Sequence, residues 1–371
     1  MRLDNVIFSL SVANAAIKNT ASFSKVDGWY PAFSATGQDV WLPDYRFDKK
    51  GIVVSAVGAR CGKAFKADGK WNVCANTHAF EVDENIADRD YCWYMLNNER
   101  WWIKGGTAQP FVKVKDSLRR EHDFPSLSKQ RNIVQILDEI SRIIELRNHE
   151  IELYDSLIKA RFVELFGNMA DPMCKWDKCK LVDACADPND IKCGPFGTQL
   201  GKDEYTSSGI EVWEIPQINS EFKTLPTHFV TKEKARALEQ YSIKPGDIAM
   251  SRKGNVGRCA VFPETFDEGI IHSDVLRIRV DDSRVAPEFM MRQLHYSGDI
   301  QRQIELVSSG AIMAGINVTK LKDIYVYVPP KETQDSFVNF VKQVDKSKVV
   351  VQNALDKTQM LFDSLMQEYF G

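Results

Sequence analysis

Apolar side chains recur every three or four positions in two long stretches of the chain that contain neither proline nor glycine. The first stretch runs from Ser128 to Phe166, and the second keeps the same phase from Phe337 to Tyr369. Alternating spacings of three and four residues are typical of a coiled-coil seam. The pattern therefore predicts two long helices, each about 55–60 Å in length at about 1.5 Å per residue.

Polar residues interrupt both seams, with Arg147 in the first and Lys348 and Thr358 in the second. Polar groups at seam positions set register and partner choice at a cost in stability. We expect the two helices to pack against each other in antiparallel orientation, which would relate the two halves of the chain by a pseudo-twofold axis. The alternative is two unrelated helices, each packed on a separate core.

An internal repeat favours the paired helices. Residues 106–167 align without a gap to residues 310–371, at a constant offset of 204. Further upstream the offset is 195–198, so that residues 52–55 match residues 248–251. Self-similarity of this kind indicates a tandem duplication. The predicted segments are a first domain at 1–124, a first long helix at 125–168, a second domain at 169–328 and a second long helix at 329–371.

The two domains outside the long helices carry the signals of mixed strands and helices. Residues 51–56 and 246–251 are short apolar runs typical of buried strands, and a turn containing glycine follows each run. All eight tryptophans lie in these domains. The expected fold class is α+β, with two globular mixed α/β domains separated by two long antiparallel coiled-coil helices in a pseudo-twofold tandem duplication.

The composition is that of an ordinary globular protein, with 371 residues, 44% of them hydrophobic, and a net charge of −3. No run of eighteen apolar residues occurs, which excludes a spanning helix. The apolar run at residues 6–12, followed by Ala13-Asn14-Ala15, imitates a secretory signal, but we interpret it as the start of a domain. The low net charge argues against a protein that coats nucleic acid regardless of sequence.

No catalytic constellation is visible in the sequence. Four clustered cysteines lack the two-residue spacing of structural zinc sites, so we interpret them as buried thiols of a protein in a reducing cytoplasm, with no metal. An enzyme or a metal site built on this cluster is the alternative. The cluster comprises Cys174, Cys179, Cys185 and Cys193. The turn at 58–64 imitates a phosphate-binding loop, but no serine or threonine follows Lys63.

The two glycine turns indicate a different chemistry, because each gathers cations where glycine lets the backbone approach a phosphate. An ordinary hairpin turn with solvated charges is the alternative. The cations of the turns are Arg60 and Lys63 in the first domain, and Arg252, Lys253 and Arg258 in the second.

The most specific motifs lie in the second domain. They are residues 194–200 (Gly-Pro-Phe-Gly-Thr-Gln-Leu), 215–219 (Ile-Pro-Gln-Ile-Asn) and 244–248 (Lys-Pro-Gly-Asp-Ile). With these motifs the chain resembles, over nearly its full length, the specificity subunit of a Type I restriction–modification system.

The first domain shows the same motifs in variant form. Residues 30–37 are similar to the family's early loop, and residues 106–110 (Gly-Thr-Ala-Gln-Pro) to its lead-in to the long helix. The second lead-in, at 309–313, lacks the Gln-Pro pair, and Ser126 stands where the family has a second proline. These departures put the local loop conformation in doubt, rather than the family.

The resemblance implies two target-recognition domains, each reading one half of a split, asymmetric site in double-stranded DNA. In a major groove, Arg and Lys can bind guanine, and Gln and Asn can bind adenine. The candidate DNA-contacting residues are therefore Arg60, Lys63, Asn76 and Gln109 in the first domain, and Gln199, Gln217, Asn219, Arg252, Lys253 and Arg258 in the second. The helical pair would set the gap between the halves and dock two modification subunits, which methylate adenine with S-adenosylmethionine. A motor-endonuclease subunit that uses ATP and Mg would join them. The chain itself would carry no cofactor and no catalysis, and would act in the cytoplasm away from any membrane. The alternative is a non-catalytic coiled-coil scaffold or adaptor that binds only proteins.

Overall fold

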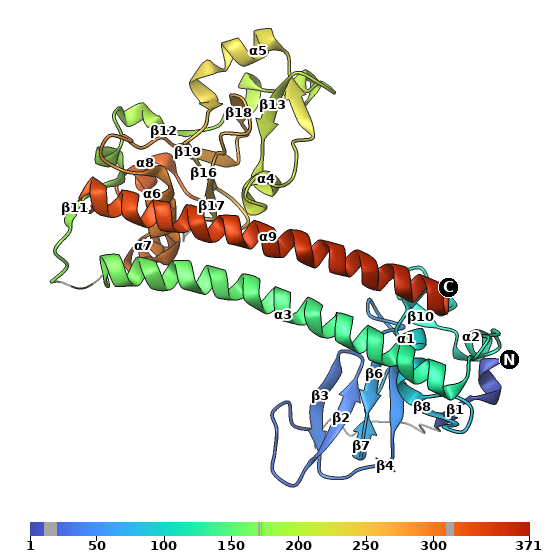
Figure 1. Cartoon of the computed structure of the whole chain (residues 1–371). Helices are drawn as coiled ribbons and strands as arrows, with labels where there is room; N and C mark the ends of the chain where they lie inside the picture. The colour runs from blue at the N-terminus through green and yellow to red at the C-terminus, as the bar shows by residue number, and fades with distance from the viewer. Residues whose placement is uncertain (11–20, 170, 172, 309–314) are drawn as a thin grey trace. The chain divides into compact units, whose positions relative to one another are not determined.

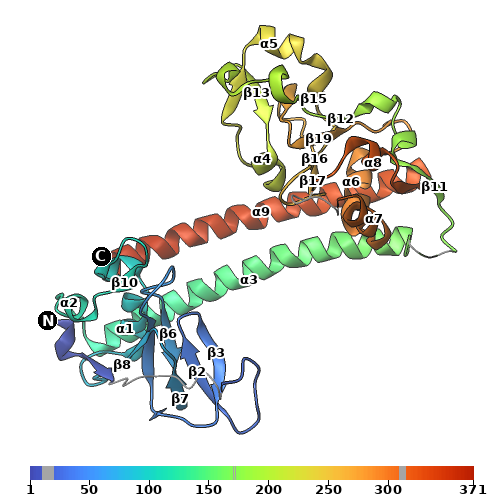
Figure 2. The same cartoon turned by 180° about the vertical axis from the view of Figure 1, so that it is seen from behind.

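The computed structural model describes residues 1–10, 21–169, 171, 173–308 and 315–371. The chain divides into two compact units, one formed by Met1–His149 with Val351–Gly371 and the other by Glu150–Val350 (Figures 1 and 2). Each unit therefore takes half of each long helix. The predicted four-segment boundaries, which follow the sequence repeat, stay a prediction.

The first unit contains two four-stranded sheets and short helices. The antiparallel sheet has the order β1 (Ile7–Leu10), β8 (Thr77–Val82), β5 (Gly51–Ser55) and β6 (Ala64–Ala67). The mixed sheet has the order β3 (Gly37–Leu42), β2 (Tyr30–Ser34), β7 (Lys70–Val73) and β4 (Phe47–Asp48). Apart from 3-10 turns and the long helices, the unit also contains α1 (Arg89–Leu96), β9 (Lys104–Gly105), β10 (Phe111–Val112) and α2 (Val114–Leu118).

The second unit repeats this plan. Its antiparallel sheet has the order β12 (Ile191–Cys193), β19 (Val275–Ile278), β16 (Ile248–Ser251) and β17 (Cys259–Val261), and its mixed sheet the order β14 (His228–Val230), β13 (Ile210–Trp213), β18 (Gly269–Ile271) and β15 (Ser242–Ile243). Strand β11 (Asp177–Lys180) pairs with β20 (Tyr325–Val328). The short helices are α4 (Ile215–Asn219), α5 (Lys232–Ala237), α6 (Pro287–Tyr296), α7 (Gly298–Ser308) and α8 (Val318–Lys322).

The long helices are α3 (Leu127–Phe166) and α9 (Lys331–Phe370), of 40 residues each. In the first unit the start of α3 and the end of α9 share one core, which contains Leu137 and Phe370. In the second unit the end of α3 and the start of α9 share another, where the rings of Phe162 and Phe337 lie 5.6 Å apart. The helices therefore pair in antiparallel orientation. The predicted fold class is confirmed, and the alternative of separate cores is wrong.

The polar residues that interrupt the seams bond across the helix pair. Arg147 donates hydrogen bonds to the carbonyl oxygen of Ala354, at 2.5 Å, and to the hydroxyl of Thr358. Lys348 contacts Asp155 at 2.6 Å. Sliding one helix along the other would break these bonds, so they favour a single register.

One buried glutamine joins each long helix to the domain before it. The amide of Gln130 donates to the carbonyl oxygens of Ile86 and Pro125 and accepts from the N–H of Asp88. Gln334, which lies 204 residues later, bonds in the same pattern to the backbone of Arg284, Ala286 and Pro329. Both glutamines are fully buried. The duplication therefore extends to the anchoring of the helices.

The signal-like Ala13-Asn14-Ala15 and the second lead-in at 309–313 both lie outside the described residues. The apolar residues just before the former are described, and Ile7–Leu10 form strand β1. Within the described part of the chain, no helix combines the length and the apolarity needed to cross a membrane.

Candidate nucleic-acid interface

The turn between β5 and β6 brings together the four candidate residues of the first unit. Its Gly58 N–H donates to the carbonyl oxygen of Pro110 at 2.8 Å, which holds the turn against the loop of Gln109. The N–H of Ala56 donates to the carbonyl oxygen of Asn76 at 2.7 Å. Three chain segments thus meet at one end of the sheet. The side chains that they expose there are Arg60, Lys63, Asn76 and Gln109.

The conformation of this end depends on residues that tolerate positive φ. Gly58 and Gly62 have φ of 98° and 95°, and Asn76 has a φ of 63°. Asparagine adopts this left-handed conformation more readily than most other residues with a side chain. The left-handed backbone therefore explains in part why an asparagine occupies position 76. Its side chain is exposed and remains a candidate for DNA contact.

The turn between β16 and β17 repeats this backbone frame in the second unit. The N–H of Arg252 donates to the carbonyl oxygen of Asp274 at 2.9 Å, as Ala56 donates to Asn76. The N–H of Ile316 donates to the carbonyl oxygen of Arg252 at 3.2 Å, as that of Val112 donates to Ala56 at 2.9 Å. The same frame therefore carries different side chains in the two units.

Two candidates of the second unit, Arg252 and Gln199, contact the exposed Phe196, and a third, Lys253, is held by an ion pair. The guanidinium of Arg252 lies 4.8 Å from the centre of the Phe196 ring, which is 48% exposed. Gln199 accepts hydrogen bonds from the N–H of Phe196 and from the hydroxyl of Tyr241, each at 3.0 Å. Lys253 pairs with Asp274 at 2.8 Å. The sequence-based list of candidates missed Phe196, although its motif had been recognised.

Arg258 lies at the other end of the turn and contacts Glu221 at 2.9 Å. Glu221 and Phe222 have φ of 53° and 60°, although neither is glycine. Such strain persists where the surroundings over-determine it. Here the Phe222 ring is buried against Trp213 and Phe262, with centroid distances of 5.4 and 5.1 Å.

The two candidates on helix α4 differ in their exposure. Asn219 is exposed at the C-terminal end of the helix. Gln217 is only 3% exposed, and its amide accepts from the N–H of Glu214 and donates to the carbonyl oxygen of Leu225. Reaching a base would break both bonds in a buried setting. The structure therefore gives Gln217 a structural role, and we remove it from the candidate surface.

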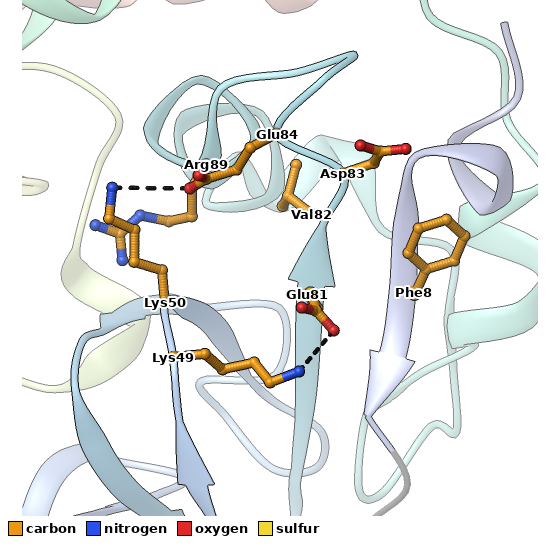
Figure 3. Close-up of a pocket in the computed structure, with 8 residues that line it drawn as sticks. All are labelled: Phe8, Lys49, Lys50, Glu81, Val82, Asp83, Glu84 and Arg89. Carbon is orange, nitrogen blue, oxygen red and sulfur yellow. Dashed lines mark hydrogen bonds and ion pairs between the residues drawn. The ribbon is translucent and has the colours of Figure 1, made fainter.

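A cavity of about 640 Å³ lies at the opposite end of β5 and β8 from the turn, between Phe8 and Arg89 (Figure 3). The lysines that line it are matched by carboxylates. Lys49 contacts Glu81 at 2.9 Å, and Lys50 contacts Glu84 at 3.7 Å. We leave this cavity out of the candidate surface because it offers no unmatched cation to an anionic partner.

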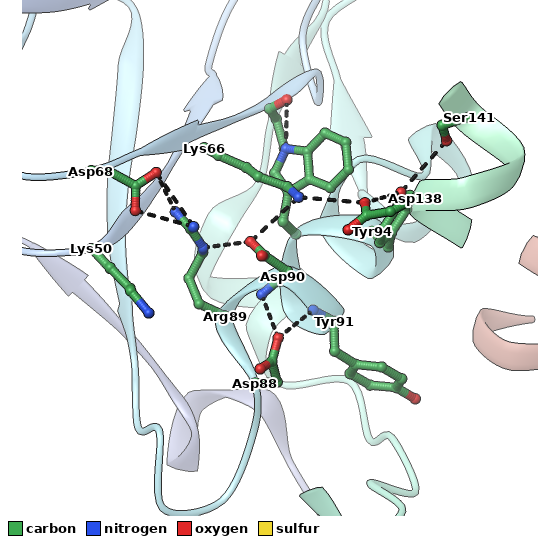
Figure 4. Close-up of polar contacts among 12 residues, drawn as sticks. Lys50, Lys66, Asp68, Asp88, Arg89, Asp90, Tyr91, Tyr94, Asp138 and Ser141 are labelled. Carbon is green, nitrogen blue, oxygen red and sulfur yellow. Dashed lines mark hydrogen bonds and ion pairs between the residues drawn. The ribbon is translucent and has the colours of Figure 1, made fainter. Parts of the chain in front are cut away.

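A polar network joins the first domain to the start of α3 (Figure 4). The hydroxyl of Tyr94, on α1, donates to Asp138 at 2.6 Å. Lys66 lies 3.4 Å from Asp90 and 3.8 Å from Asp138, and its ammonium sits 4.4 Å from the centre of the Trp93 ring. Burial raises the pKa of Tyr94, so the phenol stays a neutral donor. These bonds position the domain on its helix.

Two of the four clustered cysteines are buried in the structure, and the other two, Cys174 and Cys179, are half-buried. Cys185 and Cys193 are buried, and burial raises the pKa of the Cys185 thiol to about 12. A thiol with so high a pKa is a poor nucleophile and metal ligand at neutral pH. Among the described residues, no three His, Cys, Asp or Glu side chains are arranged to hold a metal ion.

Two like α/β domains on paired helices, each presenting a turn with cations at the end of a sheet, define a class of nucleic-acid recognition proteins. The family model for the Type I restriction modification DNA specificity domain matches residues 34–153 and 190–357. The chain belongs to this family.

Two solved structures share the fold over the whole chain. The Type-I restriction-modification system S subunit from M. genitalium has 16% sequence identity and a TM-score of 0.62, with 95% of its chain covered. A chain from a type I R-M system, reported for complex assembly and conformational transition, has 15% identity and a TM-score of 0.58, with 96% covered. All of this chain is covered in both comparisons.

Proposed function

We propose that this chain is the non-catalytic subunit that reads an asymmetric, bipartite DNA site for a Type I restriction–modification complex. The observation that carries this proposal is the repeated backbone frame of the two turns. Ala56, Asn76 and Val112 occupy in one unit the positions of Arg252, Asp274 and Ile316 in the other. One frame with two sets of side chains suits the reading of two unlike half-sites.

The proposed contacts follow from side-chain chemistry. Exposed Arg and Lys side chains bind guanine or phosphate, Gln and Asn bind adenine, and an aromatic ring such as Phe196 contacts a thymine methyl group. The proposed DNA-contacting residues are Arg60, Lys63, Asn76 and Gln109 in the first unit, and Phe196, Gln199, Asn219, Arg252, Lys253 and Arg258 in the second.

The long helices would dock two modification subunits. Apolar side chains stay exposed at positions related by the repeat: Leu146 and Val350 are 57% and 67% exposed, and Leu157 and Leu361 are 47% and 51% exposed. Exposed apolar side chains that gather on one face indicate a protein partner. Two equivalent sets suit two copies of one partner. In this proposal the partners bind S-adenosylmethionine, and a motor-endonuclease binds ATP and Mg.

Methylome sequencing tests this function. We propose that the chain acts in the cytoplasm, so a bacterial host would express it together with an adenine methyltransferase of a Type I system. We expect N6-methyladenine in a motif of two unlike halves. Replacing Arg252 and Lys253 by alanine should degrade one half of the motif and leave the other intact. If the paired proteins produce no motif, the protein-only scaffold becomes the better interpretation. Damage to both halves would contradict the assignment of one domain to each half-site.

A further inference from the structure

A polar cavity of about 580 Å³ adjoins the proposed reading turn in the second unit. One wall is the turn itself, at residues 255–258. The other walls come from the ends of α6 and α7 and from the paired α3 and α9, which contribute Lys159 and Lys348. The cavity thus lies where the domain meets its helices.

The charges around this cavity are matched except for one. Arg258 pairs with Glu221 at 2.9 Å, Lys348 with Asp155 at 2.6 Å, and Arg292 with Glu288 at 2.7 Å. Each of these cations is held in place by its carboxylate. Lys159 makes no ion pair or hydrogen bond found among the described residues, and its side chain is exposed.

His295 adds no charge to the cavity at neutral pH. Burial, together with the nearby Arg258 and Arg292, lowers the pKa of its imidazole to about 4. The ring instead accepts a hydrogen bond from the N–H of Cys259 at 3.2 Å. The unmatched charge of the cavity wall is therefore the Lys159 ammonium.

The chemistry of the wall fits an oxyanion. Lys159 supplies charge, and the Arg258 guanidinium keeps N–H donors beyond the one given to Glu221. The amide of Asn255 adds further donors, and the Gln301 amide keeps one N–H beyond the one it donates to the carbonyl oxygen of Leu294. A phosphodiester accepts hydrogen bonds and carries one negative charge, and duplex DNA places a phosphate about every 3.4 Å along each strand. A strand that passes the reading turn would bring such a group to this wall.

We propose that this cavity binds a backbone phosphate of the DNA whose bases the second domain reads, with Lys159 as the charged contact. This inference rests on the proposed function. The first unit has no equivalent contact, because Asp363 stands 204 residues after Lys159 and accepts a hydrogen bond from Gln359 at 3.0 Å. The contact therefore belongs to one half-site only.

The test uses the chain in complex with its methyltransferase and a duplex carrying the motif. For Lys159→Gln we expect weaker binding, a slope of log affinity against log salt smaller by about 1, and an unchanged methylation motif. Lys357→Gln removes an exposed lysine of α9 in the first unit and is the matched control, with the wild-type slope expected. Equal slopes for Lys159→Gln and wild type would overturn the inference.

Chemically ethylated DNA gives a second readout. Ethylation of a single phosphate in the second half-site should weaken the wild-type complex and have little effect on Lys159→Gln. No such phosphate, or one in the first half-site, would contradict the proposal. A thermal shift on adding inorganic phosphate without DNA, dependent on Lys159, would assign the cavity to a free phosphate instead. If the wild-type complex shows no preference for its motif, the proposed function itself fails.

Discussion

Asn97 and His295 occupy equivalent places in the two units and accept a hydrogen bond from the same point of the fold. The Asn97 side chain accepts from the N–H of Ala64 at 3.1 Å, at the start of β6. The His295 ring accepts from the N–H of Cys259 at 3.2 Å, at the start of β17. An amide oxygen and a neutral imidazole nitrogen are interchangeable in this role, but only the imidazole titrates in the acidic range.

This difference predicts a stability effect with a defined direction. The pKa of His295 is lowered from its ordinary value of 6.5 to about 4 in the fold, so the folded state favours the neutral ring. Its contribution is complete above about pH 6.5 and is lost as pH falls toward 4, because the unfolded chain then binds the extra proton. Between these two pH values the free energy of unfolding of wild type should fall by up to about 3 kcal/mol more than that of His295→Asn.

Urea unfolding of both proteins at pH 7 and pH 4.5 measures this difference. His295→Asn keeps an acceptor for the N–H of Cys259, so the two should be similar at pH 7. Because all other titrating groups are shared, the comparison isolates the one imidazole. Parallel loss of stability in the two proteins would show that His295 is not held neutral by the fold.

At the scale of elements, the long helices were the most predictable part of the molecule. Their spacing of apolar residues is a local signal repeated over ten turns, and α3 and α9 contain the two stretches in which it was found. The glycine turns were predictable for a similar reason, since Gly58 and Gly257 mark positive φ directly. Tertiary contacts do not override local signals of this strength.

The candidate surface was less predictable because burial and strain depend on distant residues. Nothing near Gln217 in the sequence shows that its amide would be buried as a cap for α4. Glu221 and Phe222 carry no local signal for a left-handed backbone, which is imposed by the packing of Phe222 on Trp213 and Phe262. The stacking of Arg252 on Phe196 joins segments more than fifty residues apart.

The exposed apolar face of the helices predicts how the complex assembles. Leu157 lies on α3 in the second unit, and Leu361 occupies the equivalent position on α9 in the first unit. A docked subunit would bury an aspartate at either position without a partner for its charge, and the cost of desolvating the carboxylate would oppose binding. Each substitution should therefore remove one modification subunit. Leu157→Asp and Leu361→Asp should each bind one copy, and the double variant none.

Mass measurement of the purified complexes counts the bound copies. Asn353→Asp introduces the same carboxylate at an exposed polar position of α9 and should keep both copies. Circular dichroism would confirm that the variants stay helical. Two copies on the double variant would place the docking surface elsewhere.

At the scale of the whole molecule, the proposed function gives the helix pair the role of linking two domains that read different sequences. Two cross-helix contacts define the register: Arg147 with Thr358, and Asp155 with Lys348. Along two antiparallel helices in constant register, the residue numbers of facing positions add to a constant value. The two contacts meet this condition closely. The point after His149 on α3 therefore faces the point after Asn353 on α9, and the repeat makes these two points equivalent.

Lengthening both helices at these facing points tests whether the pair measures distance along DNA. Four residues add about 6 Å, which is close to one helical turn and so nearly preserves the direction of each face. At about 3.4 Å per base pair, we expect the gap between the half-sites to grow by about two base pairs. The half-site bases should not change, because neither turn is altered. Methylome sequencing reads both features at once. An unchanged gap would mean that the helices link the readers without measuring, and altered bases would mean that the domains are not independent readers.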